Sequence, residues 1–152
     1  VIVKYPQQPE ALVAWGRKGD CQYTLGAENP ARYEEALLSY RTLLDFAGAP
    51  ADLRLQAGFK LGRCQEKMGR APAARDRYLE VLAAYAQERK PPETATVWFM
   101  RAAFAAAALQ EAAGNWREAA GTYRRVIAAG TPAAAAARTH LERLHRDRGA
   151  AF

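Results

Sequence analysis

Small and apolar residues recur along this chain with helical spacing, and they do so in three separate segments. In each segment an alanine is followed four residues later by a tyrosine and three residues after that by an aliphatic residue. The three sets are Ala36, Tyr40 and Leu43; Ala74, Tyr78 and Val81; and Ala119, Tyr123 and Val126. Offsets of three and four place side chains on one face of an α-helix. The pattern predicts three amphipathic helices of one kind.

A shared octet precedes each of these helices. The three copies read GDCQYTLG at 19–26, GRCQEKMG at 62–69 and AALQEAAG at 107–114, with Gln22, Gln65 and Gln110 in register. Each copy ends in glycine, and Gly69 and Gly114 suit the left-handed conformation that ends a helix. Each unit is therefore predicted to be a helix, a short turn at glycine and a second helix.

The pattern predicts seven helices in an all-α fold. Their expected ranges are 9–25, 31–46, 51–68, 72–88, 92–113, 115–129 and 132–148. Pro92 and Pro132 suit first-turn positions, and Thr131 suits an N-cap. We divide the chain as one domain, 1–152, with repeat 1 at 9–46, repeat 2 at 51–88, repeat 3 at 92–129 and a last helix at 132–148.

The units resemble tetratricopeptide (TPR) repeats. The likeness rests on the small residue and tyrosine of each second helix, on Trp15 four residues before Gly19, and on the Leu61–Gly62 pair. It implies an α-α superhelix, a TPR-like solenoid of about three helix-turn-helix repeats. On this interpretation residues 1–5 are the tail of a preceding repeat, and the chain is a fragment of a longer one.

The last helix is expected to cap the stack, because a terminal unit needs a polar outer side. The predicted outer residues are Arg138, Glu142, Arg143, Arg146 and Asp147.

Composition agrees with a helical globular chain. Alanine accounts for 35 of the 152 residues, and it is the best helix former. No apolar run approaches the roughly 18 residues of a membrane span. The net charge of +6 comes from basic residues interleaved with acidic ones, as in Arg75–Asp76–Arg77. We therefore expect no nucleic-acid partner, and a basic helical nucleic-acid binder is the less favoured alternative.

The residues that could carry chemistry are few and scattered. Cys21 and Cys64 occupy the same position of two units, so their backbones should stand about 8–10 Å apart, whereas a disulfide needs about 7 Å or less. We predict two buried free thiols. His140 and His145 are far from both cysteines in sequence, and Ser39 is the only serine. No metal, cofactor or catalytic residue is predicted.

Stacked helix pairs curve, so their first helices line a concave groove. The family's inner-surface positions fall on Val13, Gly16, Asp20 and Tyr23 in repeat 1; on Gln56, Phe59, Arg63, Glu66 and Lys67 in repeat 2; and on Arg101, Phe104, Ala108 and Glu111 in repeat 3. Helical spacing also puts residues such as Phe59, Arg63 and Glu66 on one face. The candidate site is Asp20, Tyr23, Gln56, Phe59, Arg63, Lys67, Arg101 and Phe104.

The expected function is a non-enzymatic scaffold that binds a protein or peptide with apolar and acidic character. An apolar anchor would meet Phe59 and Phe104, and an acidic group would meet Arg63 and Arg101. In the alternative, the two phenylalanines pack on each other or on a neighbouring repeat, and the chain is structural or self-associates through Val1–Val3. The amino-acid sequence of repeat 2 resembles those of bacterial TPR proteins of the cell envelope. This resemblance favours an envelope or periplasmic location over a cytoplasmic one.

Overall fold

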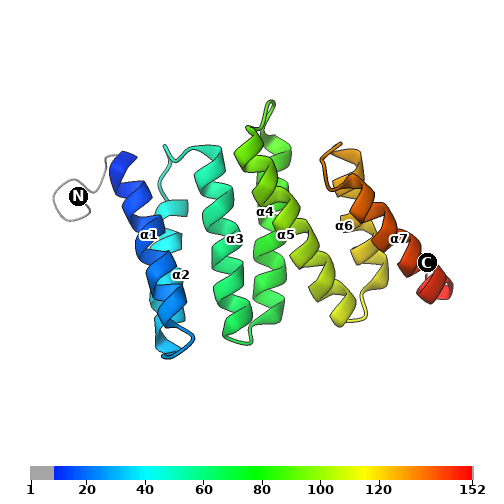
Figure 1. The fold of residues 1–152 in the computed structure, drawn as a ribbon, viewed down its shortest axis with the longest axis horizontal. Coiled ribbons are helices and arrows are strands. Elements are labelled where there is room, and N and C mark those ends of the chain that lie inside the picture. Colours follow the sequence, from blue (N-terminus) through cyan, green and yellow to red (C-terminus); the bar gives the residue numbers. More distant parts are fainter. Residues whose placement is uncertain (1–8, 152) are drawn as a thin grey trace.

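The computed structural model describes residues 9–151, and this part of the chain is all-helical (Figure 1). Its helices are α1 Pro9–Leu25, α2 Ala31–Leu44, α3 Ala51–Lys67, α4 Ala71–Gln87, α5 Glu93–Ala112, α6 Trp116–Ala128, α7 Ala134–Arg148 and a 3-10 turn, Gly149–Ala151. The predicted all-α fold is confirmed, and every helix end lies within two residues of its predicted position. The segment 1–5, predicted to be the tail of another repeat, lies outside the described residues.

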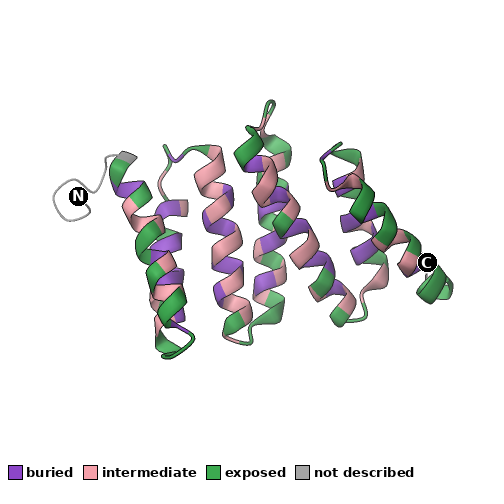
Figure 2. Cartoon of the chain, viewed as in Figure 1, coloured by how far each residue is buried: buried purple, intermediate pink, exposed green. Residues whose placement is uncertain are grey.

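Consecutive helices pack against each other from α1 to α7, and they stand side by side in a row (Figure 1). In addition, α3 packs along α5, so the first helices of repeats 2 and 3 are neighbours in space. Buried positions lie on the sides of the helices that face other helices (Figure 2).

Glycine ends the first helix of repeats 2 and 3, as predicted. Gly69 has φ 73° and Gly114 has φ 76°, in the left-handed region that residues with a Cβ seldom adopt. The next amide then reaches back over the last turn: Arg70 N donates to Gln65 O at 2.8 Å, and Asn115 N donates to Gln110 O at 2.8 Å. This bond satisfies a carbonyl that the helix end leaves unpaired.

The predicted N-cap of the last helix is wrong. Ala133, not Thr131, occupies the N-cap of α7, and no side chain caps the helix. The turn at Thr131 and Pro132 closes through the backbone instead, since Ala134 N donates to Thr131 O at 3.0 Å. Pro92 likewise stands at the N-cap of α5 rather than inside its first turn.

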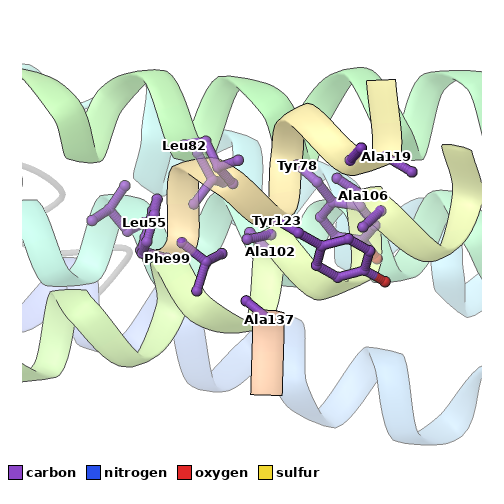
Figure 3. Packing of buried hydrophobic residues seen from close by; sticks show 14 of the residues in the cluster. Leu55, Tyr78, Leu82, Phe99, Ala102, Ala106, Ala119, Tyr123 and Ala137 are labelled. Atoms are coloured by element: carbon purple, nitrogen blue, oxygen red, sulfur yellow. The ribbon is translucent and has the colours of Figure 1, made fainter. Parts of the chain in front are cut away.

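Two clusters of buried side chains form the core. One joins α1, α2 and α3 around Leu12, Tyr40 and Leu61, and the other joins α3 to α7 around Tyr78 and Tyr123 (Figure 3). The three tyrosines of the repeat pattern are at most 2% exposed, which confirms them as packing residues. Burying a large aromatic side chain contributes roughly 1.5–3 kcal/mol each.

Each of the three tyrosines of the repeat pattern donates its hydroxyl hydrogen to a carboxylate on the first helix of its own repeat. Tyr40 donates to Asp20 at 2.6 Å, Tyr78 to Glu66 at 2.6 Å and Tyr123 to Glu111 at 2.8 Å. Burial, together with these carboxylates, raises the pKa of all three phenols above the ordinary value. The tyrosines therefore stay neutral and join the two helices of each pair.

The repeated glutamine also joins the two helices of a pair, in repeats 1 and 3. Gln22 accepts from Ser39 at 2.6 Å, and Gln110 accepts from Thr122 at 2.8 Å. Repeat 2 has Arg77 at the position of the hydroxyl residue, and Arg77 pairs with Glu80 instead. The side-chain oxygen of Gln65 is consequently buried without a partner.

The last helix is polar on its outer side, with one correction. Arg138, Glu142, Arg146 and Asp147 are exposed, as predicted. Arg143 is not an outer residue: its guanidinium donates to both carboxylate oxygens of Glu111, at 2.7 and 2.9 Å. It ties α7 to α5 because an arginine stem is long enough to reach across the end of the stack.

The two cysteines are free, but they are not both buried. Cys64 is fully buried, and this burial raises the pKa of its thiol to about 12. Cys21 is exposed, which corrects the prediction. Because α1 is the first described helix, the side of it that carries Cys21 lacks the neighbour that covers the matching side of α3.

In the native protein we expect one thiol, that of Cys21, to react promptly with Ellman's reagent, because only an accessible thiolate attacks it. Cys64 should react only after denaturant is added. A Cys21→Ser variant should lose the prompt phase entirely. Two prompt thiols in the native protein would contradict the burial of Cys64.

Candidate functional site

A cavity of about 340 Å³ lies where α1, α3 and α5 come together over the buried ring of Tyr40. We call it the central cavity. Five of the eight predicted site residues line it: Asp20, Tyr23, Phe59, Arg63 and Arg101. They come from the first helices of all three repeats. The remaining lining residues are Thr24, Tyr40, Lys60 and Trp98.

A second cavity, of about 220 Å³, opens between α1 and α3, and we call it the α1–α3 cavity. Gln56 of the predicted site lies here rather than in the central cavity. The two cavities share the side chains of Asp20, Tyr40 and Lys60. Lys60 Nζ stands 2.7 Å from Asp20 Oδ1, so this ion pair marks the border between them.

Two predicted residues lie in neither cavity. Lys67 is exposed at the C-terminal end of α3. Phe104 is half-buried, with its ring centroid 5.8 Å from that of Tyr123 and 5.6 Å from that of His140. It therefore packs within repeat 3 and against the last helix.

The predicted residue Phe59 both lines the central cavity and packs against the neighbouring repeat. Its ring centroid is 5.6 Å from that of Tyr78 and 5.7 Å from that of Trp98. Such tilted ring pairs add about 0.5–1.5 kcal/mol beyond area burial. Phe59 consequently supports the fold as well as the cavity wall, and its truncation would disturb both.

Trp98 and Lys60 are the main residues that the sequence prediction missed. Trp98 precedes Arg101 by three residues on α5, so helical spacing alone could have placed both on one face. Lys60 has no comparable local signal, because its partner Asp20 is 40 positions away. Its ammonium also stands 5.9 Å from the Tyr40 ring and 5.8 Å from the Trp98 ring.

The basic groups of the central cavity differ in how they are paired. Lys60 is paired with Asp20, and Arg63 donates to Glu66 at 2.9 Å. The exposed guanidinium of Arg101 lies over the Trp98 ring, 4.8 Å from its centroid, and pairs with no carboxylate in residues 9–151. A guanidinium that lies over an aromatic ring keeps N–H donors that can bind an anion. Arg101 is therefore the free cation of this cavity.

Comparison with known proteins adds no further constraint, since no family model, curated protein or solved structure matches this sequence. Over the described range, no helix is long and apolar enough to span a membrane. Within that same range, His, Cys, Asp and Glu side chains do not gather in threes that could hold a metal ion.

Proposed function

We propose that this chain is a non-catalytic protein-interaction module that binds an acidic peptide segment in the groove formed by the two cavities. The observation that carries the proposal is the central cavity itself. It combines three basic side chains with one carboxylate, and its free cation, Arg101, lies on an aromatic wall. A carboxylate of a partner would pair with Arg101 while an apolar group lies against Trp98 and Phe59.

The proposed architecture is a TPR-like solenoid of about three helix pairs, with α7 as its cap. Two features support it. The small residues Ala36, Ala74 and Ala119 are fully buried where the second helices pack, and the tyrosine–carboxylate bond recurs in each pair. In such a stack the first helices form one continuous inner surface, and the lining of the groove comes mainly from α1, α3 and α5.

The shape of the groove, rather than its volume, favours a peptide over a compact ligand. Binding pockets for small molecules commonly measure about 300–1,000 Å³ and enclose their ligand. Here two adjoining hollows of about 220 and 340 Å³ open along one face. Two such hollows can accept two side chains of an extended or helical segment that passes over the Asp20–Lys60 pair.

The test is a selection from a random peptide library on the immobilised protein, followed by affinity measurements on the enriched peptides. We expect enrichment of acidic sequences, and we expect Arg101→Glu to weaken their binding about tenfold or more, because it replaces the free cation with a like charge. Lys67→Glu is the matched control, since it makes the same change of charge outside both cavities. If both variants weaken peptide binding equally, the loss of affinity comes from the change of net charge alone, and the assignment of the groove is refuted.

A further inference from the structure

Repeat 1 lacks a ring that the other two repeats carry. Phe59 and Phe104 stand three residues before Gly62 and Ala107, and the residue three before Gly19 is Gly16. Each phenylalanine lies against the buried tyrosine of its own repeat, with centroids 5.6 Å apart in repeat 2 and 5.8 Å apart in repeat 3. Tyr40 of repeat 1 has no such neighbour on α1.

The helix that faces α1, which is α3, also lacks an aromatic ring at the corresponding position. Phe59 meets Trp98 of the following repeat at 5.7 Å, and Phe104 meets His140 of α7 at 5.6 Å. Trp98 stands nine residues before Ala107, and the residue nine before Gly62 is Leu53. In repeats 2 and 3 a phenylalanine ring lies between two other rings. In repeat 1 the corresponding place, between Tyr40 and Leu53, has no phenylalanine ring.

The missing ring leaves space that is open and apolar. Gly16, Tyr40 and Leu53 all line the α1–α3 cavity, and its other apolar lining residues are Leu12, Val13, Leu43 and Ala57. Its volume of about 220 Å³ exceeds the roughly 150 Å³ of an engineered protein cavity that binds benzene. A Cβ added at Gly16 would meet only Leu43 Cδ1, at 3.6 Å, which is ordinary contact.

Charge at the rim restricts what can enter. Arg17 lines the same cavity and has no carboxylate partner among residues 9–151, while Lys60 stands at the border with the central cavity. Asp20 also lines the cavity and is paired with Lys60, so the unpaired charge at the rim is that of Arg17. The apolar interior favours a ring, and Arg17 favours an acidic group next to it.

We infer that the α1–α3 cavity is an aromatic anchor site, which takes a phenylalanine side chain of the partner peptide into the place that Phe59 and Phe104 fill in their own repeats. Acidic residues flanking that phenylalanine would pair with Arg17 on one side and Arg101 on the other. This inference rests on the proposed function, and it adds the residue class and the position of the anchor.

The experiment uses two synthetic probes, acetyl-Glu-Glu-Phe-Glu-Glu-amide and its alanine analogue, titrated into the protein by calorimetry. We expect the phenylalanine peptide to bind about tenfold tighter or better, as burial of an aromatic ring implies. Gly16→Phe should fill the cavity from within, and the two peptides should then bind equally. Gly16→Ala is the matched control, because it removes the glycine but leaves the cavity open, and it should keep the preference.

Thermal unfolding gives a readout that needs no peptide. Both substitutions gain helix propensity over glycine, but only Gly16→Phe buries a ring, so its Tm should rise above that of Gly16→Ala. If Gly16→Phe does not fold, Gly16→Leu replaces it and should reduce the preference for the phenylalanine peptide at least severalfold.

The outcomes separate the two proposals. The anchor site is refuted if both peptides bind the unmodified protein equally, or if the Gly16→Phe variant still prefers the phenylalanine peptide. Neither result contradicts peptide binding in the groove. If neither peptide binds but Arg101-dependent library peptides do, the anchor chemistry alone is again wrong. If no acidic peptide of any kind binds, the proposed function fails and the anchor site falls with it.

Discussion

Gly62→Leu is expected to destabilise the protein by about 3 kcal/mol, with a fall in Tm of roughly 10 °C. A Cβ at this position would overlap the ring of Tyr78, which is fully buried. The ring cannot swing aside, because its hydroxyl is bonded to Glu66 at 2.6 Å and its face lies against Phe59. Overpacking of this kind forces side chains away from their preferred rotamers. Denaturant unfolding followed by circular dichroism measures the loss.

Gly121→Leu is the control for the change of residue type. A Cβ at Gly121, in the middle of α6, would meet no atom within 4 Å. This variant should therefore gain the helix propensity of leucine over glycine, roughly 0.5–1 kcal/mol. The same substitution is thus expected to have opposite signs at the two sites. If Gly62→Leu were as stable as the unmodified protein, the close contact of α3 with α4 would be wrong.

Glu111→Ala is expected to cost about 2 kcal/mol and to loosen α7 before the rest of the stack. The Glu111 side chain is 16% exposed and accepts hydrogen bonds from Tyr123 and Arg143. Its removal takes away the carboxylate that accepts from the buried Tyr123 hydroxyl and leaves that hydroxyl only His140 Nδ1, at the longer distance of 3.4 Å. This loss accounts for most of the penalty. Arg143 is 39% exposed and regains water, so its part is small. Hydrogen exchange should rise first in the amides of α7.

Glu142→Ala is the matched control for Glu111→Ala. It removes the same type of side chain from the exposed side of α7, where no ion pair within the described chain involves it. We expect a change of less than about 0.5 kcal/mol. Equal exchange in α7 for both variants would show that the Glu111–Arg143 bond does not hold the last helix in place.

The helices and their packing tyrosines could be predicted because both depend on local pattern. The offsets of three and four residues that put Tyr78 on the same face as Ala74 and Val81 are a property of the helix itself. Gly69 ends a helix for an equally local reason, since it accepts a φ of 73° without strain. The spacing of residues along the chain was therefore enough to predict the helices, their packing tyrosines and the glycine that ends a helix.

The site could be predicted only in part, because its remaining features depend on which helices meet. The Asp20–Lys60 pair joins residues that are 40 positions apart, and Arg143 reaches Glu111 across 32. Phe104 shares its place in the repeat with Phe59, yet it faces His140 of the last helix instead of the central cavity. Cys21 and Cys64 also share one place, and only the neighbours of their helices make one exposed and the other buried.

In the proposed function, the partner binds in the groove formed mainly by α1, α3 and α5. Nuclear magnetic resonance mapping of the acidic phenylalanine peptide on the isotope-labelled protein locates the binding surface residue by residue. We expect the largest shift changes at the Trp98 indole, at Gly16 and at the Arg101 amide, with small changes along α2, α4 and α6. Changes concentrated on those second helices, with Trp98 and Gly16 unaffected, would contradict binding in the groove.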